Sequence, residues 1–189
     1  MSAATFLLLK DIQKELEIFF ESKSFPVPNE NNSENNSKKF TAPNIVIGHL
    51  PPKKSIKSDK PPFIIVRPWE GTQGKKNGTN ADVHEIRIGL VCCVWTDEES
   101  SETEAGYNLI TNMIDGVLQT LVSKRFWNNN FFTIHKEIEW KVGLTKEQGV
   151  YEAGLQDHPF YGAAVTATFE SEALKFPRPI GTIDAEEKL

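Results

Sequence analysis

The chain has 189 residues, of which 39% are hydrophobic and 25% are charged, and its formal net charge is −5. This composition is typical of one ordinary globular domain, and no apolar run approaches the roughly 20 residues that a membrane-spanning helix requires. The mild negative charge argues against nucleic acid as the main partner, because phosphate binding depends on an excess of basic residues on one face.

The two cysteines, Cys92 and Cys93, are adjacent in the sequence. Neighbouring residues on a strand point to opposite faces, so this pair does not form a disulfide framework, and we expect a reducing cytoplasm. The apolar run Phe6–Leu9 has no basic segment before it and no small-residue cleavage site after it, so no export signal is expected.

Apolar residues recur at spacings of three and four along Ser2–Ser22, which predicts a first helix. Pro26 and Pro28 end this helix. The Asn-rich stretch Asn29–Lys39 contains no apolar residue to offset the entropy of ordering it, so residues 28–40 are predicted to form a mobile loop.

Two strands are predicted next, at Asn44–Leu50 and Phe63–Trp69. Pro68 limits the second strand to an edge position at that end, because proline lacks the N–H that pairs with a neighbouring strand. Gly71–Asn80 is rich in turn-forming residues and is predicted to be a hairpin loop.

The centre of the chain is predicted to be a long strand that runs into a long helix. In Val83–Trp95 apolar residues occupy every second position, and from Val91 onward both faces become apolar. We therefore expect the end of this strand to be covered on both sides, by another element or another subunit. A cluster of carboxylates and cap residues precedes an amphipathic helix that should begin near Ser101.

Two more strands are predicted, at Phe132–Val142 and Tyr161–Phe169, separated by a loop over Gly143–Pro159. The order of elements predicts the α+β class: an antiparallel sheet of four to five strands with two helices packed on one face. Residues 1–174 should form a single domain, and residues 175–189 an extended tail. The predicted core includes Ile88, Leu90, Val117, Leu121, Ile138 and Val165.

Candidate chemical groups each have a plainer structural interpretation. His135, Glu137 and Glu139 share one strand face with metal-ligand spacing, but that face is the polar side of a half-buried strand. Burial of Cys92 and Cys93 should suppress thiol reactivity, and the Gly71–Lys76 stretch lacks the spacing of a phosphate loop. The carboxylates of Asp97–Glu104 fit a helix start, and the basic run Lys53–Lys60 fits a solvated loop. We expect no catalytic residue, no cofactor and no metal.

The order of features resembles the tail terminator (tail completion) and neighbouring minor tail or neck proteins of long-tailed bacteriophages and prophages. The resemblance spans about Pro61–Ala173 and is carried by an N-terminal helix, the Pro-Pro-Phe63-Ile-Ile-Val-Arg67 strand, the polar loop Gly71–Asn80 and the strand His84–Trp95. The helix opening with Gly106-Tyr107-Asn108 and the two final alternating strands complete it.

This resemblance implies a small structural subunit rather than an enzyme, which assembles into a ring, usually of six, that caps the tail tube and joins the tail to the head. Its partners would be further copies of itself, the tail-tube protein and a head-completion or connector protein, with no membrane and with DNA only passing through the ring. It would be made in the bacterial cytoplasm and reside in the virion tail. A head–tail connector or tail-tube protein is the alternative, and a small cytoplasmic ligand-binding domain or enzyme is a third. Loops and the tail are the expected contact surfaces, with candidate residues Trp69, Gly71, Lys75, Lys76, Tyr151, Phe176 and Ile180.

Overall fold

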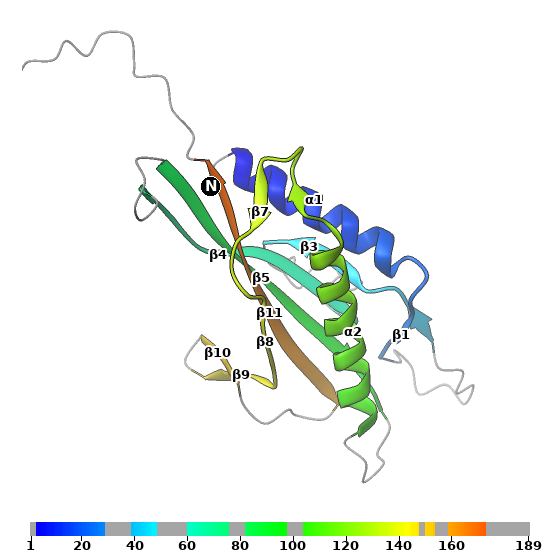
Figure 1. Cartoon of the computed structure of the whole chain (residues 1–189). Helices are drawn as coiled ribbons and strands as arrows, with labels where there is room; N and C mark the ends of the chain where they lie inside the picture. Colours follow the sequence, from blue (N-terminus) through cyan, green and yellow to red (C-terminus); the bar gives the residue numbers. More distant parts are fainter. Residues whose placement is uncertain are drawn as a thin grey trace, which may run out of the picture.

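The computed structural model describes residues 3–28, 39–48, 60–75, 82–97, 104–147, 150–153 and 159–172. Figure 1 shows two long helices beside a twisted sheet; helix α1 is Ala3–Phe20 and helix α2 is Glu104–Ser123. Neither helix is long and apolar enough to cross a membrane.

The main sheet has seven strands: β3 (Asn44–Ile47), β4 (Phe63–Lys75), β5 (Asp82–Trp95), β6 (Phe126–Trp127), β7 (Phe132–Ile134), β8 (Glu139–Val142) and β11 (Phe160–Glu172). Their order is β3-β4-β5-β11-β7-β6, and β8 pairs with β11 beside β7. Strand β3 is parallel to β4, while the other pairings are antiparallel. Two small pairs complete the described strands, β1 (Phe25–Pro26) with β2 (Phe40–Thr41) and β9 (Leu144–Glu147) with β10 (Val150–Ala153).

The α+β class is confirmed, but the prediction of an antiparallel sheet of four to five strands is wrong. The sheet is larger because short strands join its edges, and it is mixed because β3 and β4 run in the same direction. The predicted strand Phe132–Val142 is divided into β7 and β8, because the backbone leaves the ladder at residues 135–138. At that break the N–H of His135 still donates to the carbonyl of Thr168, 2.9 Å away.

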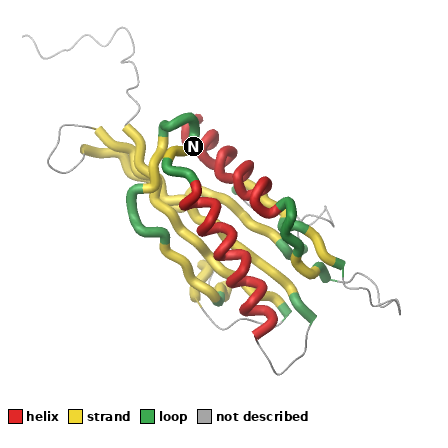
Figure 2. The backbone as a smooth tube through the Cα atoms, turned by 45° about the vertical axis from the view of Figure 1, so that its right-hand side comes forward, coloured by secondary structure: helices red, strands yellow, loops and turns green. Residues whose placement is uncertain are grey.

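Both helices pack on one face of the sheet, α1 against β3 and β4 and α2 against β5 and β11 (Figure 2). The core lies between these layers. Of the predicted core residues, Ile138 is only partly buried, and the others are fully buried: Ile88, Leu90, Val117, Leu121 and Val165. The alternation of apolar residues in β5 and the helical spacing in α2 therefore identified the face that folding removes from water.

Three predicted loops differ from the structure. Strand β4 continues to Lys75, so Gly71–Lys75 belongs to a strand rather than to a hairpin loop. The predicted loop Gly143–Pro159 contains the β9–β10 hairpin, which the chain enters at Gly143 with a positive φ of 83°. Phe40 pairs in β2, so it is not part of a loop. Residues 29–38 of the predicted mobile loop, and the tail 175–189, lie outside the described residues.

A polar cluster links the end of α2 to α1. The ammonium group of Lys124 lies 2.7 Å from a carboxylate oxygen of Glu15 and 3.0 Å from one of Asp11. The second oxygen of Asp11 accepts a hydrogen bond from the N–H of Asn128, the first of three consecutive asparagines with positive φ. Burial alone would lower the pKa of Lys124, but its hydrogen bonds to Glu15 and Asp11 and their charges raise it overall. These contacts hold the turn after α2 against the first helix.

Candidate interaction surface

One face of the main sheet points away from the helices, and we call it the outer face. Residues paired across neighbouring strands share a face, so the side chains opposite the buried ones on β5 define it. Along β4, β5 and β11 the outer face includes Phe63, Ile65, Arg67, Glu70, Thr72, Glu85, Arg87, Gly89, Val91, Cys93, Trp95, Phe160, Gly162, Ala164, Thr166, Thr168 and Glu170. Neither α1 nor α2 covers it, and the β9–β10 hairpin lies on this side of the sheet (Figures 1 and 2).

The outer face has an apolar half at the C-terminal end of β5. The register places Ile65 of β4 and Ala164 of β11 on either side of Val91, and Phe160 opposite Trp95. The side chains of Val91 and Ala164 are buried, whereas Phe160 at the edge of the face is 50% exposed. This arrangement agrees with the prediction that both faces become apolar from Val91 onward. The helices cover only one of those faces.

Trp69 stands at the middle of the outer face because of a β-bulge. The register between β4 and β5 shifts between Pro68 and Glu70, which leaves Trp69 without a partner on β5. Its ring lies over Gly89, where a side chain would collide with it. The guanidinium group of Arg67 lies 5.1 Å from the ring centroid, within the range of a cation–π contact. A bulge, a glycine and a cation thus hold an aromatic side chain that is 43% exposed.

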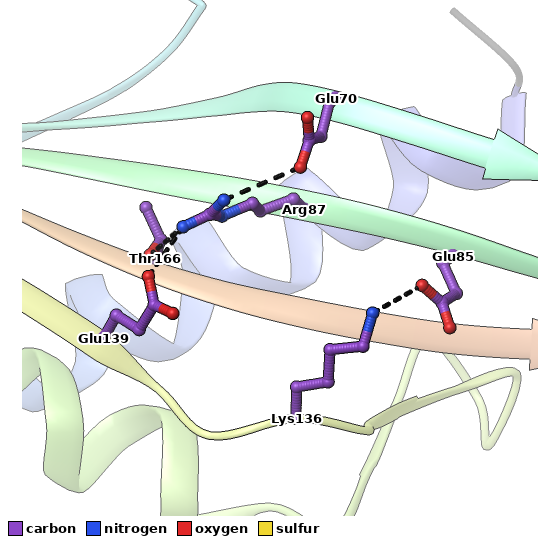
Figure 3. Close-up of polar contacts among 6 residues, drawn as sticks. All are labelled: Glu70, Glu85, Arg87, Lys136, Glu139 and Thr166. Atoms are coloured by element: carbon purple, nitrogen blue, oxygen red, sulfur yellow. Dashed lines mark hydrogen bonds and ion pairs between the residues drawn. The ribbon is translucent and has the colours of Figure 1, made fainter.

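The other half of the outer face is charged, and Arg87 is at its centre (Figure 3). Its guanidinium group lies 2.7 Å from Glu139 of β8 and 3.6 Å from Glu70 of β4, and donates to the Thr166 hydroxyl of β11 at 3.3 Å. Exposed ion pairs of this kind stabilise a fold only slightly. Their main consequence is that Arg87 of β5 contacts side chains from three other strands, β4, β8 and β11.

A second charged cluster lies beyond Arg87. Glu85 and Glu170 are directly opposite each other on β5 and β11. His135 follows β7 and lies between them, with Nδ1 2.9 Å from a Glu170 oxygen and Nε2 3.9 Å from Oε1 of Glu85. The ammonium group of Lys136 lies 2.8 Å from the other Glu85 oxygen (Figure 3).

The sequence pattern grouped His135 with Glu137 and Glu139, whereas in the structure it lies beside Glu85 and Glu170. Glu139 lies against Arg87, and the metal-capable group that the described residues contain is Glu85, His135 and Glu170. Alternation along one strand identifies which residues share a face, but only the register between strands shows which of them meet. The polar positions of Glu85 and Glu170 were visible in the sequence, whereas their pairing was not.

The two thiols behave as small core side chains. Cys92 is buried among the core residues and Cys93 is partly buried on the outer face. Burial raises the pKa of both to about 12, and Cys93 adds to the rise at Cys92. The thiolate forms that attack substrates or bind metals are therefore disfavoured at neutral pH, as the sequence indicated.

The predicted contact residues are scattered rather than joined in one site. Trp69 is on the outer face, and the exposed Gly71 lies further along β4. Lys75 is the last residue of β4, and Tyr151 lies on β10. Lys76, Phe176 and Ile180 lie outside the described residues. Sequence reasoning missed Phe160, whose position at the start of an alternating strand was the available signal.

No protein-family model matches the sequence, and the search of curated proteins finds no significant match.

Proposed function

We propose that the chain is a structural subunit of a long-tailed bacteriophage, a tail terminator that forms a ring, capping the tail tube and joining the tail to the head. The observation that carries this proposal is the apolar half of the outer face. Its exposed large side chains are aromatic, Phe160 at 50% and the neighbouring Trp69 at 43%, and no described helix covers them. Surfaces of this kind are typical sites of protein–protein contact.

A ring of identical subunits requires two different surfaces on each subunit. One surface contacts the preceding copy and the other contacts the following copy. The apolar half, with Phe160 and Trp69 exposed, supplies one of them. The second surface would be formed by loops and by the C-terminal segment 175–189 of the neighbouring copy. The order of elements that resembles tail terminators, and the α+β class, support the choice of a tail protein. The tail-tube protein and a head connector are then the further partners, and DNA passes through the ring.

The experiment uses a phage or prophage whose copy of this gene is deleted and restored in trans. We compare the double variant Trp69→Ser/Phe160→Ser with the control Phe40→Ser/Phe126→Ser, and image the particles by electron microscopy. The control removes two aromatic side chains of similar exposure, at 56% and 43% against 50% and 43%. Phe126 also matches Trp69 in having an arginine over its ring, at 5.3 Å.

We expect overlong or headless tails with the outer-face variant and normal particles with the control. Thermal melting of both purified proteins verifies that each is folded. Normal tails and heads with a folded outer-face variant would contradict the proposal, and so would equal defects in both variants. Complete loss of tails with the gene deleted would favour a tail-tube protein instead.

A further inference from the structure

We propose that the chain forms a two-fold symmetric dimer in which strand β8 pairs antiparallel with β8 of a second copy. Strand β8 lies at an edge of the main sheet, where it pairs with β11 and with no other described strand (Figure 1). This contact uses a different surface from the apolar half of the outer face, so it does not depend on the proposed function.

The free side of β8 offers backbone groups of Trp140 and Val142. The N–H of Gly143 donates to the carbonyl of Gly162, 2.9 Å away, so these two glycines form a hydrogen-bonded pair that continues the β8–β11 ladder. In an antiparallel ladder, such pairs alternate with pairs whose N–H and C=O groups point away from each other. By this alternation Lys141 bonds to β11, whereas the N–H and C=O groups of Trp140 and Val142 point to the open side.

The opposite edge of the sheet differs in this respect. There the side-chain amide of Gln13 donates to the carbonyl of Ile45 in β3, 2.8 Å away, so helix α1 reaches the backbone of that strand. No described side chain bonds to the backbone of Trp140 or Val142. An open edge strand is a template for a further strand, and the side chain of Trp140 beside it is 53% exposed.

The side chains of β8 favour a second copy of the same strand as the partner. Charges on an edge strand usually repel a further strand, but Glu139 and Lys141 have opposite signs and are two residues apart. If Trp140 lies opposite Trp140 of the second copy, an antiparallel pair places each Glu139 opposite a Lys141. The symmetry repeats this contact, and opposite charges directly across neighbouring strands stabilise their pairing.

Both charged groups are available for these contacts. The Lys141 side chain is exposed and makes no ion pair with a described residue. Glu139 contacts Arg87 through Oε2 at 2.7 Å, but its side chain is 66% exposed, so the other oxygen can accept from a lysine. Shifting the register by two residues would oppose Lys141 to Lys141, or Glu139 to Glu139, and like charges in that position repel. The charges therefore specify one register.

The test is analytical ultracentrifugation of the untagged full chain. The paired segment is short, so we expect a weak, reversible dimer. Concentrations up to about 1 mM are therefore needed, at which a dimer with a Kd of about 100 μM is well populated. Lys141→Glu and Glu139→Lys each oppose like charges twice, and each should weaken dimerisation at least about tenfold. An equal mixture of these two variants restores both pairs of opposite charges and should associate about as tightly as the native chain. The matched control Lys14→Glu makes the same charge change on an exposed residue of α1 and should leave the dimer unchanged.

Hydrogen exchange followed by NMR distinguishes strand pairing from association through side chains alone. The amides of Trp140 and Val142 should exchange more slowly as the protein concentration rises, because they gain partners in the second copy. The amide of Lys141 is already bonded to β11, so its exchange should change less.

A native chain that remains monomeric at the highest concentration would overturn the proposal. A dimer that tolerates Lys141→Glu, a mixture that fails to associate, or exchange at Trp140 and Val142 that ignores concentration would each overturn it too. Circular dichroism verifies that each variant is folded. The outer-face variant Trp69→Ser/Phe160→Ser should dimerise like the native chain, so failure of the dimer and failure of the ring are separate results.

Discussion

Replacing Gly89 with alanine should destabilise the protein by displacing the ring of Trp69. The new Cβ would lie 2.8 Å from Cζ3 of the ring and closer still to Cε3, so the ring must lift from the sheet. A covered aromatic side chain buries about 150–250 Å², and Trp69 is 43% exposed, so lifting uncovers roughly 100 Å². At about 25 cal/mol per Å² this costs about 2.5 kcal/mol. The better strand propensity of alanine over glycine returns about 0.5–1 kcal/mol, which leaves a net loss of about 2 kcal/mol.

The assay is urea denaturation of four proteins: the native chain, Gly89→Ala, Trp69→Ala and the double variant. If the ring causes the loss, Gly89→Ala should cost about 2 kcal/mol in the native background and nothing, or a slight gain, in the Trp69→Ala background. An equal cost in both backgrounds would refute this reasoning and would place the strain in the backbone of β5 instead.

Three further substitutions test the packing. Leu121→Ala should cost about 2–5 kcal/mol in chemical denaturation, because the side chain is fully buried on the sheet-facing side of α2; a loss below about 1 kcal/mol would mean that this face is wrongly assigned. Ser171→Ala should cost nothing, or should stabilise by up to about 1 kcal/mol, because the buried hydroxyl has no hydrogen-bond partner among the described residues. A clear loss of stability would show that the hydroxyl does bind a partner. Lys124→Met should cost about 1 kcal/mol at pH 7, a value reduced because the side chain is 34% exposed. The raised pKa of Lys124 means that this contribution is present below the ordinary lysine pKa of about 10.4 and fades as the pH rises through the raised value. A Lys124→Met difference that persists at strongly alkaline pH would contradict the ion-pair explanation.

The parts of the fold that local periodicity determines were predictable from the sequence. Alternation in β5 and β11 and the three-and-four spacing in α1 and α2 are repeated over many residues, so each pattern indicates both the type of element and its buried face. The effect of Pro68 was also predictable, because β3 pairs with β4 only as far as Val66.

The parts that depend on contacts distant in sequence were not predictable. The parallel pairing of β3 with β4 follows from how the chain returns to the sheet, which no local pattern records. The division between β7 and β8 preserves the alternation of side chains, so the sequence still reads as one strand. The cluster of Glu85, His135 and Glu170 combines three segments, and finding it requires the register between β5 and β11.

The charged half and the apolar half of the outer face differ in how much a neighbouring molecule gains by covering them. In the charged half, Arg87 and Lys136 already contact the carboxylates of Glu70, Glu139 and Glu85, so a partner gains little by replacing these contacts. In the apolar half, exposed aromatic surface is removed from water only when another molecule covers it. Association should therefore be driven by the apolar half, while the cluster of Glu85, His135 and Glu170 lies at the opposite end of β5. Since the apolar half and the cluster of Glu85, His135 and Glu170 are separate, His135→Ala should assemble like the native chain.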